Sequence, residues 1–132
     1  MNYHILLTID VEDWFQVENF KQWIPFSSWS SYELHVEKNT HQLLDLMDSI
    51  TLEPSSLLAS QLPSSANLPK ASFFVLGWLA ERLPGLVREI HSRGHEVASH
   101  GYNHNLCNQQ SCEDLKKDLK DSKKLLEDII GS

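Results

Sequence analysis

Residues 70–104 read KASFFVLGWLAERLPGLVREIHSRGHEVASHGYNH, and this stretch holds the pattern that decides the fold. Its apolar start, Ala71 to Leu76, predicts a buried strand. A helical pattern follows and is expected to break at Pro84, which suits the first turn of a new helix, and to end at Arg93-Gly94. His95 to Ser99 then predicts another short strand. The order strand, helix, strand indicates a parallel α/β unit.

The same alternation extends outward in both directions. Tyr3 to Asp10 is aliphatic and β-branched and predicts a strand that ends in acidic residues. Trp14 to Tyr32 is aromatic-rich and is expected to be irregular, with one helical turn near Glu18 to Trp23. Val36 to Ile50 has helical spacing of its apolar residues, with Thr40 as the expected N-cap.

The last segment, Cys112 to Ile130, predicts an amphipathic helix with its lysines on the solvent side. The stripe that we expect to be buried consists of Leu115, Leu119, Leu125, Leu126 and Ile129. Between the helix at 36–50 and the strand at 71–76, residues 51–70 are rich in serine and proline. We interpret them as a mobile surface insertion within one domain that spans residues 1–132.

Composition excludes several classes of function. The chain has 132 residues, 41% hydrophobic and 22% charged, which is ordinary for a globular domain. Its formal net charge of −7 gives it no electrostatic reason to bind nucleic acid. The apolar N-terminal run is too short for a signal sequence or a membrane span, so a cytoplasmic location is expected. In that compartment Cys107 and Cys112 are expected to be reduced thiols.

Two polar clusters follow expected strands, where parallel α/β proteins place their active sites. One contains His100 and His104, whose spacing would put both imidazoles on one side of a helical turn. Imidazole is the commonest protein ligand for zinc and related metals. The other contains Asp10, Glu12 and Asp13, three carboxylates that repel one another unless a cation compensates them. Each cluster alone is also compatible with a solvated turn, but together they predict a metal site.

These residues resemble a known family, the NodB-like polysaccharide deacetylases. The N-terminal TIDVEDWF is similar to a variant of the family's first motif, and KASFFVLGWLAERLPGLVREIHSRGHEVASHGYNH is similar to its second strand, helix and histidine motif. The similarity is particularly close to the branch found with bacterial exopolysaccharide loci. It covers residues 3–15 and 70–131 and leaves the Ser/Pro-rich insertion unmatched.

The resemblance implies the N-terminal portion of a distorted parallel (β/α) barrel. It also implies metal-dependent hydrolysis, usually with zinc, of N- or O-linked acetyl groups on an acetylated polysaccharide or oligosaccharide. His100 and His104 would be the two histidine ligands and Asp10 the general base. The third ligand falls on Glu12 or Asp13, and Glu12 is favoured because other branches space the two acids by one residue.

The resemblance also implies parts that this sequence does not contain. The family uses a later arginine–proline motif, a further acid and a C-terminal histidine as general acid, and its barrel needs on the order of 200 residues. We therefore interpret the chain as truncated and expect little or no turnover from it alone. The alternatives are a non-catalytic metal-binding fragment and an interaction protein. An unpaired sheet edge would in that case offer a surface to a second copy.

Overall fold

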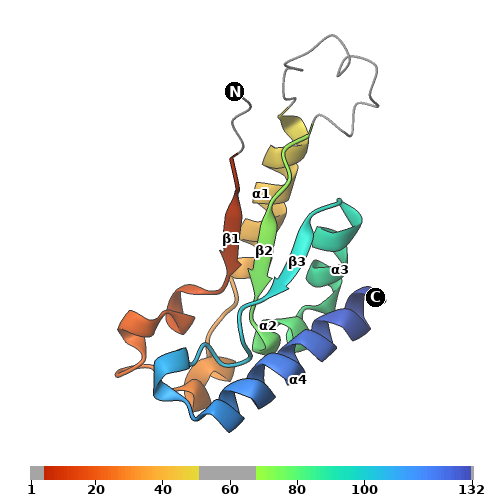
Figure 1. Ribbon diagram of the computed structural model, residues 1–132. Helices are drawn as coiled ribbons and strands as arrows, with labels where there is room; N and C mark the ends of the chain where they lie inside the picture. The colour runs from red at the N-terminus through yellow and green to blue at the C-terminus, as the bar shows by residue number, and fades with distance from the viewer. Residues whose placement is uncertain (1–4, 51–67, 132) are drawn as a thin grey trace.

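Three parallel strands form the sheet of the computed structural model, which describes residues 5–50 and 68–131 (Figure 1). Their order is β1 (Thr8–Val11), β2 (Ser72–Val75) and β3 (Glu96–Ser99). Thr8 is paired with Ser72, and Ser72 with Glu96, so the strands begin and end in register. All three carboxyl ends therefore lie at one edge, as the sequence pattern predicted.

The apolar residues of the central strand explain why it lies in the middle. Phe73 and Val75 of β2 are almost completely buried, and Ala71 and Leu76 beside it are buried as well. β1 is shorter than expected. Ile5 and Leu6 precede the paired region and are exposed, so they belong to no strand despite their apolar character.

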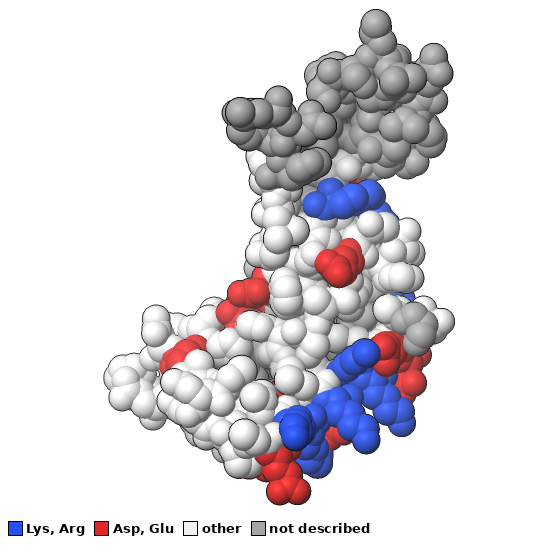
Figure 2. Space-filling model, in the orientation of Figure 1, with Lys and Arg blue, Asp and Glu red and all other residues white. Residues whose placement is uncertain are grey.

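The described residues also form four α-helices: α1 (Val36–Ser49), α2 (Gly77–Arg82), α3 (Pro84–Ser92) and α4 (Cys112–Ile130). The break between α2 and α3 is the one predicted at Pro84, which occupies the first turn of α3. α3 packs on α1, and α4 runs along α2, α3 and β3 (Figure 1). The lysines of α4 form a basic surface away from the sheet, as expected (Figure 2).

Two details of the predicted helices are wrong. Thr40 lies inside α1 and is buried, so it is not the N-cap. The cap is supplied from far away in sequence, because Asp13 Oδ2 accepts hydrogen bonds from the backbone N–H groups of His35 (2.6 Å) and Val36 (2.9 Å). In α4, Leu126 is buried but Leu119 is 47% exposed. The inward face contains polar Ser122 instead.

The segment between β1 and α1 is irregular, as expected, and contains three short 3-10 helices. They are η1 (Trp14–Gln16), η2 (Glu18–Phe20) and η3 (Phe26–Ser31). Its aromatic residues pack on one another, with Phe15 stacked on Tyr32 at a ring-centroid distance of 5.1 Å. This packing gives the segment a small aromatic core in place of regular secondary structure.

Most of the Ser/Pro-rich insertion, residues 51–67, lies outside the described residues, so its predicted mobility stays a prediction. Across residues 5–50 and 68–131, none of the helices combines the length and the apolar character needed to cross a membrane. Cys107 and Cys112 are both exposed and are not joined by a disulfide.

Candidate metal site

The carboxyl ends of β1 and β3 place a glutamate and two histidines together. Glu12 follows the last residue of β1, and His100 follows the last residue of β3. Glu12, His100 and His104 each offer one ligand atom, and these atoms all lie within 4.8 Å of one another. Two clusters that are about 90 residues apart in the sequence therefore meet at one edge of the sheet.

The distances within this group suit a metal ion. His104 Nε2 lies 3.4 Å from Glu12 Oε2. Two ligands of a tetrahedral zinc ion, each at roughly 2 Å from it, are about 3.4 Å apart. The His100 and His104 rings have their centroids 4.9 Å apart. Asp10 lies beside the group, with Oδ2 4.0 Å from His100 Nε2, and its side chain is 57% exposed.

Burial gives an independent indication of a missing partner. Glu12 Oε2 and His100 Nε2 are inaccessible to solvent and make no hydrogen bond to the described residues. On His104, Nε2 is the nitrogen that faces Glu12, and the unbonded buried atom is the other ring nitrogen, Nδ1. A buried carboxylate oxygen without a partner is costly, and a cation would remove most of that cost. A carboxylate with two imidazoles is also a donor set that catalytic zinc sites use.

Asp13, which the sequence left open as an alternative third metal ligand, has a structural role instead. It is only 4% exposed, and its Oδ1 accepts a hydrogen bond from the N–H of Trp14 at 3.0 Å. Its Oδ2 is occupied by the N-terminus of α1, and its own N–H donates to Gln16 Oε1 at 2.7 Å. Both oxygens are therefore used in holding the chain, and the structure brings Glu12, not Asp13, to the histidines.

The segment from His100 to Asn105, which we call the His loop, is not the helical turn that the spacing suggested. No helix is assigned to it, and Gly101 and His104 both have positive φ, 75° and 55°. Positive φ is uncommon for a residue other than glycine, and such strain gathers at functional sites. The two imidazoles come together because the loop folds back on itself, which residue spacing does not reveal.

Two residues near the site were missed by the sequence reasoning. Asp118 and Ser122 on the inward face of α4 form hydrogen bonds with the His loop and with Ser99 at the end of β3. They are four residues apart and so share one side of the helix. Polar residues at this spacing, within a stripe that should be apolar, were the signal available in the sequence.

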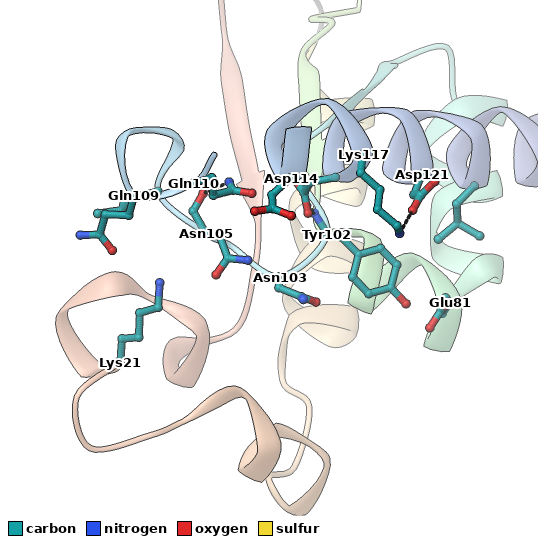
Figure 3. Close-up of a pocket in the computed structure, with 13 residues that line it drawn as sticks. Lys21, Glu81, Tyr102, Asn103, Asn105, Gln109, Gln110, Asp114, Lys117 and Asp121 are labelled. Carbon is teal, nitrogen blue, oxygen red and sulfur yellow. Dashed lines mark hydrogen bonds and ion pairs between the residues drawn. The ribbon is translucent and has the colours of Figure 1, made fainter. Parts of the chain in front are cut away.

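A groove of about 800 Å³ lies beside the His loop, between α4, the end of α2 and Lys21 (Figure 3). Tyr102 and Asn103 of the loop line it together with Glu81 of α2. Burial and a hydrogen bond to Glu81 raise the pKa of Tyr102 to about 12. The phenol therefore stays neutral throughout the physiological range and can donate a hydrogen bond there.

Comparison with known proteins gives a family and a fold. Residues 65–132 match the model of the family described as polysaccharide deacetylase. Over 58 residues the chain is 38% identical to a peptidoglycan-N-acetylglucosamine deacetylase from Bacillus cereus. This match covers 44% of the chain and 27% of that relative, so the chain corresponds to only part of the protein that it resembles.

Several solved structures resemble almost the whole chain, among them the following two. A peptidoglycan deacetylase from Bacillus subtilis aligns with a TM-score of 0.60 at 20% identity, covering 96% of this chain and 44% of that one. A family 4 carbohydrate esterase from Bacillus anthracis aligns with a TM-score of 0.61 at 17% identity, covering 96% and 42%. At these identities the likeness shows the fold, and it confirms the predicted portion of a distorted parallel (β/α) barrel.

Proposed function

Because the chain belongs to the polysaccharide deacetylase family, we propose that it supplies the metal-binding half of an active site that removes acetyl groups from a polysaccharide. The observation that carries this proposal is the convergence of Glu12, His100 and His104, with buried donor atoms that lack partners. The relatives named for peptidoglycan and its N-acetylglucosamine support an N-acetylated glycan as the substrate.

Glu12, His100 and His104 are the residues that would hold the ion, and their mixed nitrogen and oxygen donors suit zinc. A divalent cation bound there would polarise the acetyl carbonyl and lower the pKa of a coordinated water. The three side chains come from two strand ends and are mostly enclosed. The position of the reacting acetyl group would therefore be set by the sheet edge, and bulk water would be partly excluded from it.

Asp10 is the residue of this chain that would accept a proton. Its carboxylate lies next to His100 and is more than half exposed, so a water molecule and a substrate can both reach it. Proton transfer to a positioned carboxylate typically contributes about 10²–10⁴-fold to a hydrolysis rate. Hydrolysis of the acetamide by water then gives acetate and a free amine on the sugar.

Titration of the purified chain with Zn²⁺ tests the site directly. We expect one equivalent to bind, with binding lost in His100→Ala and His104→Ala and strongly weakened in Glu12→Gln. His91→Ala is the matched control, because His91 is an exposed residue of α3 outside the group. Equal Zn²⁺ affinity in the His100→Ala variant and the wild type would contradict the proposal.

Acetate release tests the substrate. Oligomers of N-acetylglucosamine are compared with an O-acetylated xylan fragment, and the His100→Ala variant, incubated with the same concentration of Zn²⁺, serves as the blank. Long incubations are needed, because the matched region covers only 27% of the Bacillus cereus relative. Acetate above the blank only from the N-acetylated oligomers would support an amide substrate. Acetate only from the xylan would contradict this and indicate that the chain hydrolyses acetyl esters.

A further inference from the structure

We propose that Asp118 and Ser122 of α4 are positioning residues that set the geometry of His100 and His104. This inference rests on the proposed metal site and adds to it the part of the protein that holds its two histidines in place. The His loop contains two residues of positive φ and is not supported by helical hydrogen bonds of its own. Such a conformation persists only where its surroundings fix it.

Asp118 holds the middle of the loop. Its Oδ1 and Oδ2 accept from the N–H of Tyr102 at 3.1 and 3.3 Å, and Tyr102 lies between the two histidines in sequence. A hydrogen bond to an ionised acceptor is stronger than one between neutral groups. The backbone also approaches Asp118 closely, because a Cβ added to Gly101 would lie 2.8 Å from Asp118 Oδ2. The absence of a side chain at Gly101 is what permits this contact.

Ser122 fixes the start of the loop. It is completely buried, and its hydroxyl lies 2.7 Å from the hydroxyl of Ser99 and 3.2 Å from the carbonyl oxygen of Gly101. Ser99 in turn accepts from the N–H of Gly101 at 3.1 Å. The residues on both sides of His100 are therefore tied to α4, and the direction of the His100 side chain depends on that connection.

The opposite side of the loop is held by α2. The N–H groups of Gly77 and Trp78 donate to the carbonyl oxygens of Gly101 and Tyr102, at 2.9 and 3.1 Å. The loop backbone is thus clamped between the start of α2 and the inward face of α4. Removing the α4 side would leave the hydrogen bonds to α2 and the one from the N–H of His100 to the carbonyl oxygen of Val75 at 3.0 Å. His100 would stay attached to β2, while residues 101–105 could shift and separate the two imidazoles.

Asp118→Ala, Asp118→Asn and Ser122→Ala test this role, with Asp121→Asn as the control. Asp121 lies on the same helix but forms an exposed ion pair with Lys117. We expect Zn²⁺ affinity to fall about tenfold or more in Asp118→Ala and Ser122→Ala, as is typical when groups that orient metal ligands are removed. Asp118→Asn keeps an acceptor for the Tyr102 N–H and should recover part of the affinity, and Asp121→Asn should match the wild type.

Two further measurements separate positioning from general stability and from the metal itself. The visible spectrum of bound Co²⁺ should change in Asp118→Ala, since it reports the ligand geometry. Amide hydrogen exchange of residues 100–105 in the metal-free protein should become faster in the same variant, with β2 unchanged. If the wild type binds no metal while this exchange effect is present, the proposed function fails and the anchoring stands. Unchanged exchange and unchanged affinity in Asp118→Ala would overturn the inference.

Discussion

The end of β1 and the His loop supply the residues of the candidate site. Both are held by hydrogen bonds between an aspartate side chain and the backbone, but the two aspartates differ in their burial and in the number of these bonds. In each region an aspartate next to the candidate ligands accepts backbone N–H groups. At β1 this is Asp13, which directly follows Glu12 and binds the start of α1. In the His loop it is Asp118, which comes from α4 and binds Tyr102.

The two aspartates differ in burial and in the number of backbone hydrogen bonds that they accept. Asp13 is almost fully buried and accepts three backbone hydrogen bonds from two segments, so it links β1 to α1 across the whole aromatic excursion. Asp118 is half-buried and binds one N–H group. We conclude that Asp13 ties the end of β1 to the buried core through two segments, whereas Asp118 holds the His loop through one backbone N–H group.

The largest expected effect is a difference in the free energy of unfolding between variants of Asp13 and of its neighbour Glu12. Asp13→Ala should destabilise the protein by about 3 kcal/mol or more, because each hydrogen bond to a charged group is worth roughly 1.5–3 kcal/mol. Glu12→Gln should leave the stability of the metal-free protein nearly unchanged, since Glu12 Oε2 has no hydrogen-bond partner in the described structure. Urea unfolding in the presence of a chelator measures both. A larger loss from Glu12→Gln would reverse the roles assigned to the two acids.

A smaller effect is expected from alanine at two glycines with similar backbone conformations. Gly131 has φ 78° and open space around it, so Gly131→Ala should cost only the left-handed conformation, about 1 kcal/mol. Gly101 has φ 75° and would in addition bring a Cβ against Asp118, so Gly101→Ala should cost about twice as much. Thermal unfolding of both variants gives the comparison. Equal losses of stability in the two variants would mean that Gly101 is not in close contact with Asp118 of α4.

The smallest effect concerns the other end of β3, where His95 is 3% exposed. Its Nδ1 accepts from the N–H of Ala71 at 3.3 Å, and burial, with the nearby charge of Lys70, lowers its pKa below the usual 6.5. Between the lowered folded pKa and 6.5 the unfolded chain binds more protons, so stability falls as the pH decreases through this window.

Above pH 6.5 the folded and unfolded states both contain neutral His95, and this dependence disappears. His95→Gln should make the stability curve flatter below pH 6.5, whereas the exposed His91→Gln should leave its slope unchanged. Unfolding free energies measured from pH 5 to 8 decide between them. Identical slopes in all three proteins would show that His95 is not held neutral by the fold.

Much of the fold could be predicted because its signals are local. Pro84 breaks the pattern between α2 and α3, and the polar–apolar alternation in residues 112–130 gives the bounds of α4. Strands that alternate with helices indicate a parallel sheet, and that fixes which ends of β1 and β3 lie together. The meeting of Glu12 with the histidines follows from this topology.

The parts that were wrong depend on contacts between distant segments. The cap of α1 is supplied by Asp13, so a search for a polar residue near the helix start selected Thr40 instead. The histidine spacing suggested a helical turn, but His104 adopts a left-handed conformation that its residue type does not encode. Leu119 is exposed and Ser122 is buried against Ser99, and only the folded structure shows that hydrogen bond.

Asp13 holds together the two ends of the aromatic segment between β1 and α1. One carboxylate binds both ends of it, Trp14 at the start and His35 at the finish. The entropy cost of closing a loop rises only slowly with its length, by about 0.6 kcal/mol for each doubling. The exposed part of this segment around Trp23 can therefore be lengthened, shortened or replaced, provided that the buried Phe15 and Trp29, which pack on Trp78, are kept. For protein engineering, this is the location at which a foreign loop could be grafted beside the site to alter what reaches it.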